Sequence, residues 1–394
     1  MWCGMTGRHE NDVLEDLRGF DREAMTELAR SVVGDPVADI AGGWSCSALS
    51  AVSIGNGTLG FFKVEGSATS HDGTLPWSVV VKIMEPLAED ANLANSPARE
   101  IQAYESDFVS VDRPGRQAAA CYRVDHRPDG TVWLWLQDLS RLKRETWTTR
   151  DYLSAAKQIG LFNGSCPEAE ANGMDWIDRS GVSDRRKGPI SAEKQSRFQR
   201  ALSEPMVQRT AVGIGMDRAA RLYDDVLKLV DASSAFPKII SHNDCHTRNL
   251  FLEYGEHGSD GDDVLYAIDW ASVGLTPVGV DGGTFVASGF TWGREEAEVA
   301  AGAEALAFDA YFEGLINAGW QQPKDEVRLV FLTVAATYAL QNMNVIYQGT
   351  TNERWEKMLT ARIAPTLEQV ADEFSERQQL MIPLVDEALS LISA

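Results

Sequence analysis

The hydrophobic pattern of the chain changes near residue 138. Before that point β-rich segments dominate, and after it nearly every segment repeats its apolar residues at helical spacing. The predicted strands are 47–54, 60–68, 77–84, 118–126 and 131–139, and the predicted helices of this part are 21–34 and 95–108. The exception in the second part is a hairpin of 249–254 with 264–270. We therefore predict an α+β fold, with a small antiparallel-sheet lobe at 1–137 and a larger, mainly helical lobe at 138–394.

Composition and charge exclude several classes of function. The 394 residues carry a formal net charge of −22, so a nucleic-acid partner, which needs many Lys and Arg contacts to phosphate, is not expected. The longest apolar run, 329–340, is too short to cross a bilayer, so no membrane partner is expected either. Five cysteines without a CxxC pair, and a charged N-terminus without a signal-peptide core, predict a cytoplasmic protein.

The stretch SHNDCHTRNLFL (241–252) gathers reactive side chains and permits three interpretations. As a zinc site, the loop's His242, Cys245 and His246, with His257 downstream, match none of the usual ligand spacings. As a thiol nucleophile, Cys245 needs a base that faces it, and adjacent residues of an extended loop seldom face each other. The third interpretation, a loop for phosphoryl transfer, requires partners elsewhere in the chain, and the chain contains them.

Asp244 and Asn249 have the D-x-x-x-x-N spacing of a kinase catalytic loop. In such a loop the aspartate accepts or aligns the proton of the substrate hydroxyl, and the asparagine oxygen binds Mg²⁺. Asp269 follows Asn249 by twenty residues, at the end of an apolar strand. We therefore predict that Asp244 is catalytic and that Asn249 and Asp269 bind Mg²⁺.

Upstream, the sequence GNGTLG (55–60) places three glycines between two predicted strands. A dinucleotide-binding fold would continue with a helix, whereas here a strand follows, which is the kinase arrangement. Residues without a Cβ allow backbone amides to approach phosphate. We therefore expect Gly55, Gly57, Thr58 and Gly60 to bind ATP.

Lys82 ends an apolar strand, 22 residues after the glycine loop, and suits a ligand of the α- and β-phosphates. Glu100, on the next predicted helix, would pair with Lys82 and fix its position. Taken singly, Lys82 could be an exposed edge lysine and Glu100 a solvated helical glutamate. The ordered set of glycine loop, strand lysine, helix glutamate, D-x-x-x-x-N and strand-end aspartate is far more specific than any one member.

At these residues the sequence resembles the aminoglycoside phosphotransferase and choline kinase-like family of small-molecule kinases. The family's catalytic loop reads H-G-D-x-x-x-x-N and here reads HNDCHTRN, so Asp244 and Asn249 carry over. Asn243 replaces the glycine, which leaves the loop geometry open. AIDW resembles the family's metal-binding segment, and Lys82 and Glu100 match its lysine–glutamate pair.

The resemblance implies a two-lobed protein kinase-like fold and roles for further residues. WLWLQDLS resembles the strand and hinge whose backbone holds adenine, so residues 135–139, Gln137 and Leu139 among them, would contact the base. GLTPVGVDGG resembles the segment whose aspartate, here Asp281, braces the catalytic loop, and His242 is expected to be structural as well. The H-R-D, D-F-G and A-P-E segments of protein kinases do not occur.

The sequence therefore predicts a Mg²⁺- and ATP-dependent phosphotransferase that acts on a hydroxyl of a small polar molecule. Aminoglycosides, amino sugars, sugars and choline-like amines all remain candidate acceptors, and the net acidity slightly favours a cationic one. The alternative is a nucleotide-binding pseudokinase scaffold without turnover. The presence of all five polar positions weighs against the scaffold, because a scaffold has no need of them.

Overall fold

The computed structural model describes residues 10–49, 57–71, 73–86, 97–106, 108–110, 113–115, 117–179, 192–255, 263–292 and 294–393. The chain forms two compact units. The first comprises residues 1–112, 117–143 and 268–272, and the second comprises 113–116, 144–267 and 273–394. The first carries an antiparallel sheet and the second is mainly helical, so the predicted α+β fold is confirmed.

The first unit is built on a five-stranded antiparallel sheet in the order β1-β2-β3-β6-β5. Its strands are β1 (Asp39–Ala48), β2 (Thr58–Ser70), β3 (Gly73–Met84), β5 (Cys121–His126) and β6 (Val132–Gln137). The predicted strand 47–54 overlaps the end of β1, which begins already at Asp39, and residues 50–54 of the prediction lie outside the described residues. Gly42 and Gly43 interrupt the apolar alternation there, so the early part of the strand has no clear pattern.

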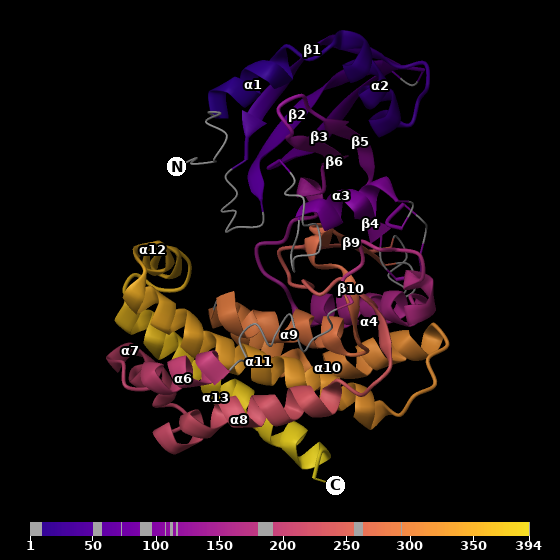
Figure 1. Ribbon diagram of the computed structural model, residues 1–394. Coiled ribbons are helices and arrows are strands. Elements are labelled where there is room, and N and C mark those ends of the chain that lie inside the picture. Colours follow the sequence, from indigo (N-terminus) through magenta and orange to yellow (C-terminus); the bar gives the residue numbers. More distant parts are fainter. Residues whose placement is uncertain are drawn as a thin grey trace. The chain divides into compact units, whose positions relative to one another are not determined.

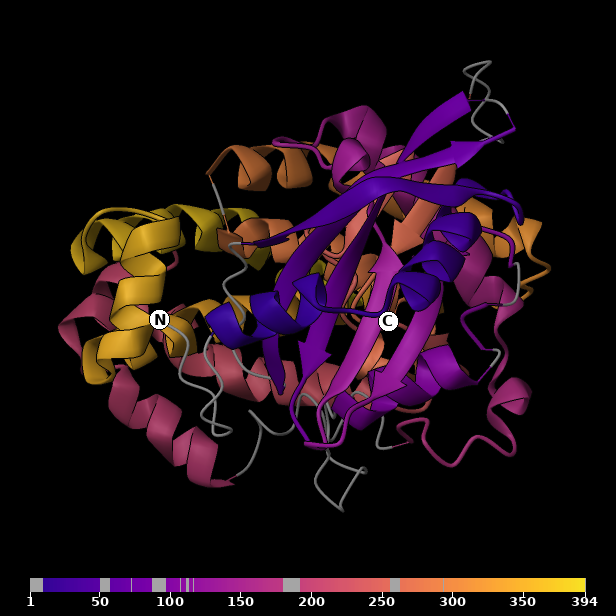
Figure 2. The ribbon, with the colours of Figure 1, turned by 90° about the horizontal axis from the view of Figure 1, so that it is seen from above.

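Helices cover both faces of this sheet. On one face lie α1 (Glu10–Arg18) and α2 (Arg22–Val33), which Figure 2 shows crossing the strands. Leu28 of α2 packs there in one core with Val64 and Val79. On the other face, Ile101 of α3 (Pro97–Glu105) packs with apolar residues of β6. Lys82 shares that second face, because it lies opposite Leu134 in the sheet register.

The second unit is an assembly of helices, with short strands on both sides of the loop 242–249. Its longer helices run beside one another in Figure 1. The helices are α4 (Thr149–Ser165), α6 (Ala192–Ala201), α7 (Pro205–Ala211), α8 (Met216–Ser233), α9 (Val280–Trp292), α10 (Arg294–Asn317), α11 (Lys324–Thr351), α12 (Glu353–Arg362) and α13 (Leu367–Leu391). The strands β7 (Lys238–Ser241) and β10 (Gly274–Pro277) pair with each other, and β8 (Leu250–Glu253) pairs with β9 (Val264–Ala267).

Helices α4 and α10 approach each other closely because glycines face the contact. A Cβ at Gly160 of α4 would lie 2.0 Å from the carbonyl oxygen of Tyr311, and one at Gly314 of α10 would lie 2.1 Å from that of Lys157. Real side chains do not tolerate such distances, so both positions require glycine. The contact brings polar side chains of the two helices together beneath the loop 242–249.

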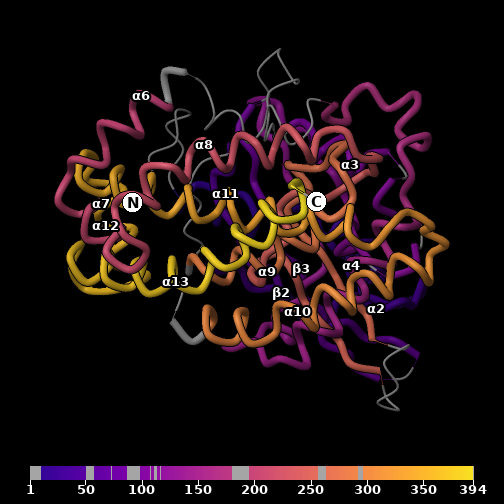
Figure 3. The backbone as a smooth tube through the Cα atoms, turned by 90° about the horizontal axis from the view of Figure 1, so that it is seen from below, coloured from indigo at the N-terminus to yellow at the C-terminus, as the bar shows by residue number. Residues whose placement is uncertain are grey.

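Helix α11 forms the centre of the second unit, between α8 and α13 (Figure 3). By length and composition it is the one described helix that could cross a membrane, but 78% of its most apolar window is buried inside the unit. Such burial is typical of the core helix of a globular protein.

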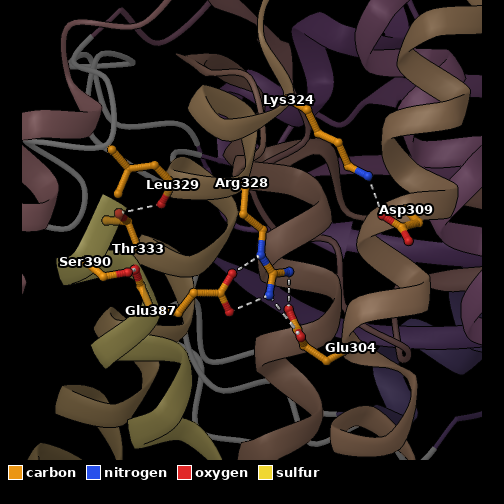
Figure 4. Close-up of polar contacts among 8 residues, drawn as sticks. All are labelled: Glu304, Asp309, Lys324, Arg328, Leu329, Thr333, Glu387 and Ser390. Carbon is orange, nitrogen blue, oxygen red and sulfur yellow. Dashed lines mark hydrogen bonds and ion pairs between the residues drawn. The ribbon is translucent and has the colours of Figure 1, made fainter. Parts of the chain in front are cut away.

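A half-buried arginine joins three of these helices (Figure 4). Arg328 of α11 donates to Glu304 of α10 at 2.5 Å and to Glu387 of α13 at 2.8 Å. These charge-assisted hydrogen bonds raise the pKa of Arg328 against the opposing effect of burial. The packing of α10, α11 and α13 is therefore fixed by directional contacts as well as by apolar burial.

Candidate active site

The glycine loop is described from Gly57 onward, and Gly55 lies outside the described residues. Gly57 adopts a φ of 66°, in the left-handed region that favours glycine, and its carbonyl accepts a hydrogen bond from Glu85 at 2.6 Å. Thr58 and Gly60 lie in the first residues of β2. The backbone at this end of the strand thus has the conformation for which the sequence supplies a glycine.

Lys82 lies near the end of β3 and is only 3% exposed. Its ammonium group contacts the carboxylate of Glu100 at 2.5 Å and that of Asp269 at 3.4 Å. Glu100 comes from α3 and is fully buried, whereas the side chain of Asp269 is one-third exposed. The first unit therefore brings together three of the residues that the sequence singled out.

Burial and charge act in opposite directions on this ion pair. Burial raises the pKa of Glu100 to about 7, and the positive charge of Lys82 limits that rise. Burial alone would lower the pKa of Lys82, but the carboxylates of Asp269 and Glu100 outweigh it and raise the pKa. Lys82 is therefore held as a cation inside the first unit, next to two carboxylates.

The segment that carries Asp269 is anchored within the first unit. Asp269 has a φ of 63°, and Arg99 of α3 donates to the carbonyl of Ala271 at 2.9 Å. The ring of Trp270 meets Phe108 edge-on at 6.1 Å between centroids. These contacts hold the Asp269 backbone in an unusual conformation from which its carboxylate reaches Lys82.

The predicted adenine-binding hinge follows β6. Gln137 ends the strand and donates its backbone N–H to Ala120 at 2.8 Å, and Leu139 is buried. Between them, the carboxylate of Asp138 accepts from Ser78 at 2.8 Å and from the backbone of Ser140 at 2.9 Å. The chain that leaves the sheet is therefore fixed on both sides of residue 138.

Asp244 and Asn249 face each other across the loop between β7 and β8 in the second unit. The amide nitrogen of Asn249 donates to the carboxylate of Asp244 at 2.9 Å and to its backbone carbonyl at 3.1 Å. The side chain of Asp244 is 37% exposed, whereas Asn249 is nearly buried. The carboxylate of Asp244 therefore lies at the surface with its direction fixed. The amide oxygen of Asn249 takes no part in these two hydrogen bonds.

Asn243 stands where the H-G-D-x-x-x-x-N loop of the family that the sequence resembles has a glycine. It adopts a φ of 64°. Asparagine tolerates the left-handed region better than most residues. Its side chain also makes use of the position: it accepts from Thr276 at 2.9 Å and donates to the carbonyls of Ser241 and Gly274 at 3.3 Å. The substitution therefore preserves the loop conformation and ties the loop to β10.

Asp281, at the start of α9, braces the same loop from beneath. Its two carboxylate oxygens accept the backbone N–H of His242 at 2.9 Å and of Asn243 at 2.7 Å. Asn163 of α4 donates to the same carboxylate at 3.0 Å, and Tyr311 of α10 donates to Asn163 at 2.9 Å. All of these side chains are buried, so the peptide before Asp244 is set by a network that reaches two helices.

Sequence reasoning missed Asn163 and Tyr311. The available signal was a lone asparagine within the apolar face of a predicted helix, because a buried amide needs partners. Its partner, however, is 118 residues away along the chain. Only the packing of α4 against α9 and α10 identifies which groups it meets.

The geometry of this loop gives little support to the zinc and thiol interpretations. Cys245 is fully buried, and the ring of His242 accepts the backbone N–H of Asp244 at 3.3 Å. His246 instead points to the carboxylate of Asp244, at 3.6 Å. Among the residues that the structure describes, no three His, Cys, Asp or Glu side chains gather as metal ligands.

A family model described as the phosphotransferase enzyme family matches residues 175–320, which include Asp244, Asn249, Asp269 and Asp281. The predicted resemblance to this family is confirmed. No curated protein matches the sequence. Similar solved structures include a protein assigned as an aminoglycoside phosphotransferase from Ralstonia eutropha JMP134, with 14% identity over 94% of this chain and 98% of that chain, and a TM-score of 0.52.

Two further similar structures have lower TM-scores. A choline/ethanolamine kinase family protein from Mesorhizobium loti shares 14% identity over 93% of this chain and 99% of that chain, with a TM-score of 0.46. An amicoumacin kinase in complex with AMP-PNP, Ca²⁺ and Ami shares 11% identity over 94% and 97%, with a TM-score of 0.48. The family match and the fold support a small-molecule phosphotransferase.

Proposed function

We propose that this protein transfers the γ-phosphate of Mg²⁺-bound ATP to a hydroxyl group of a small polar molecule. The observation that carries the proposal is the pair Asp244–Asn249. A partly exposed carboxylate is oriented by an amide at 2.9 Å, within a loop whose backbone is held by the buried Asp281. Phosphoryl transfer depends mainly on positioning and charge stabilisation, which is what such an arrangement provides.

In this proposal Asp244 accepts the proton of the acceptor hydroxyl. The acceptor oxygen bonds to the γ-phosphorus as the bond between that phosphorus and the ADP oxygen breaks. The hydrogen bond from the Asn249 amide nitrogen fixes the direction of the carboxylate that would receive this proton. Lys82, fixed by Glu100, contributes positive charge for the phosphates.

Each unit offers one oxygen ligand that suits a hard cation such as Mg²⁺. The amide nitrogen of Asn249 is engaged by Asp244, so its oxygen is the atom offered to a metal, and Asp269 offers a partly exposed carboxylate. When bound, Mg²⁺ neutralises charge on the phosphates. Backbone amides near Gly57 and the hinge at Gln137 and Leu139 would hold the rest of the nucleotide.

The experiment is a phosphorylation screen of the full chain with Mg²⁺ and ATP. Aminoglycosides, amino sugars, sugars and choline-like amines are the acceptors, ADP release is measured, and the phosphorylated product is identified by mass spectrometry. We expect acceptor-dependent ADP release that a chelator abolishes. The pseudokinase scaffold predicts nucleotide binding with no phosphorylated product from any acceptor.

A further inference from the structure

The turn that leads into Asn249 is held by a carboxylate of another element. The backbone N–H of Asn249 donates to the carbonyl of His246 at 2.8 Å, which closes a β-turn over residues 246–249. Thr247 is the second residue of this turn, and its hydroxyl donates to the carboxylate of Glu296 at 2.6 Å. Glu296 lies in the first turn of α10, 49 residues further along the chain. The loop is therefore held by α10 as well as by α9.

The two helices support different parts of the loop. Asp281 of α9 accepts the backbone N–H groups of the two residues before Asp244. Glu296 of α10 accepts the side-chain hydroxyl of the turn before Asn249. Since Asp244 and Asn249 together carry the proposed function, each half of the loop has a carboxylate support of its own.

The position of Glu296 is fixed by the packing of α10. Its neighbours Ala297 and Ala300 are buried, and a Cβ at Gly289 of α9 would lie 2.8 Å from the Cβ of Ala300. The close approach of the two helices therefore requires glycine at that position of α9. Glu296 itself is half-buried, and the helix dipole stabilises a negative charge in the first turn of a helix. Its carboxylate is thus a fixed acceptor for the turn.

The turn 246–249 needs such a support for a physical reason. A turn closed by one backbone hydrogen bond is weakly ordered by itself, because ordering its residues costs more than one hydrogen bond contributes. A hydrogen bond to a carboxylate is stronger than one between neutral groups. The contact between Thr247 and Glu296 therefore links the turn to a packed helix.

We propose that Glu296 is a positioning residue, which holds the turn 246–249 through Thr247 and thereby keeps Asn249 against Asp244. This inference rests on the proposed phosphotransferase function and adds a residue that acts through another. The amide nitrogen of Asn249 fixes the direction of the Asp244 carboxylate, and its oxygen is the atom offered to Mg²⁺. A turn that moves would weaken both.

The test changes the two ends of this hydrogen bond. Thr247→Val keeps the shape of the side chain and removes the hydroxyl, whereas Thr247→Ser keeps the hydroxyl. Glu296→Met removes the acceptor, whereas Glu296→Gln keeps an acceptor oxygen. The Val and Met variants should lower kcat about tenfold, and the Ser and Gln variants should retain at least about a third of the original kcat. An unchanged kcat in Thr247→Val and Glu296→Met would overturn the inference.

The double variant Thr247→Val/Glu296→Met shows whether the two residues act together. If their contact positions the loop, the double variant should lose no more kcat than either single variant, about tenfold. Losses that multiply to about a hundredfold would contradict the proposed route through Thr247.

Glu313→Met is the matched control. Glu313 is an exposed carboxylate of the same helix, and it pairs with Lys157 of α4 at 2.8 Å. Its removal should leave kcat unchanged, because the pair does not contact the turn. A loss equal to that of Glu296→Met would assign the effect to the packing of α10 and refute the role of Glu296.

Hydrogen exchange separates this inference from the proposed function, because it needs no turnover. Exchange of the peptide that covers residues 242–252, followed by mass spectrometry, should be about tenfold faster in Thr247→Val and Glu296→Met and nearly unchanged in Thr247→Ser. Faster exchange in a protein that phosphorylates no acceptor would support the positioning contact and refute turnover. Phosphorylation by a protein whose loop exchange and kcat ignore both substitutions would support the phosphotransferase and refute the role of Glu296.

Discussion

The two units hold their candidate functional groups by different means. In the first unit, Lys82 is fixed by buried carboxylate contacts, at 2.5 Å from Glu100 and 3.4 Å from Asp269. In the second, Asp244 remains partly exposed, and the peptide before it is held by hydrogen bonds to the buried Asp281. In the first unit the candidate functional group is itself part of a buried ion pair. In the second unit the carboxylate proposed to react is separate from the groups that support it.

This difference predicts which substitutions affect stability and which affect only chemistry. If one member of a buried ion pair is removed, its partner is left as a buried charge without a counter-charge, and the fold is destabilised. A surface carboxylate whose position is set by backbone contacts can be neutralised with little structural cost.

The largest effect on the first unit is expected from Asp269→Asn. An amide is a poorer ligand than a carboxylate for a hard cation, so ATP affinity in the presence of Mg²⁺ should fall by about 100-fold or more. Titration of ATP with and without Mg²⁺ measures the effect. Unchanged Mg²⁺-dependent affinity would show that Asp269 is not a ligand.

Lys82→Met should reduce both nucleotide affinity and stability, because Glu100 loses its counter-charge. A carboxyl pKa raised to about 7 in the folded state, against about 4.3 in the unfolded chain, means that stability is lost as pH rises through this interval. Without Lys82 the pKa of Glu100 rises further. The variant should therefore be destabilised by about 3 kcal/mol at pH 8 and by less at pH 6.

Denaturant unfolding at the two pH values provides the measurement. Lys63→Met serves as the control, at a more exposed lysine of the same sheet that contacts Glu65 and Asp138. Because the pKa of Asp138 is lowered, its charge is the same at both pH values, and the control should show little pH-dependent loss. A loss for Lys82→Met that is equal at both pH values would contradict the coupling to Glu100.

Asp281→Asn should damage the second unit selectively. The amide cannot accept both backbone N–H groups as a carboxylate does, so turnover should fall about 10- to 100-fold and the melting temperature should drop. Nucleotide affinity, measured by calorimetry, should be retained. A matching loss of nucleotide affinity would argue against a brace that acts on the catalytic loop.

The smallest effect is expected from Tyr311→Phe, which removes one hydroxyl from the network behind Asp281. Loss of its hydrogen bonds to Asn163 and Gly279 should cost about 1–2 kcal/mol of stability and a several-fold decrease in kcat without a change in KM for ATP. Tyr347→Phe on α11 is the control. If both variants lower kcat equally, Tyr311 has no particular role in positioning the loop.

The sequence predicted which candidate residues meet, Lys82 with Glu100 and Asp244 with Asn249, better than it predicted the contacts that support them. Asp244 and Asn249 are close in sequence, and the loop between two strands alone brings them together. Lys82 and Glu100 follow from the order strand, then helix, with one apolar face on each. These are local patterns, in which spacing determines geometry.

The supporting contacts depend on long-range packing and could not be read in this way. Asn163 of α4 meets Tyr311 of α10 because Gly160 and Gly314 allow these two helices to approach closely, and no local pattern reveals which helices those are.

The most direct test of the account is Asp244→Asn, measured for turnover and for nucleotide affinity in the same preparation. The amide preserves the volume of the side chain and can still accept from Asn249, but it is no longer a proton acceptor. We predict a fall in kcat of about a thousandfold with unchanged ATP affinity and melting temperature, while Cys245→Ser, in the adjacent position, retains turnover. A variant Asp244→Asn that remains active would contradict the mechanism proposed for this loop.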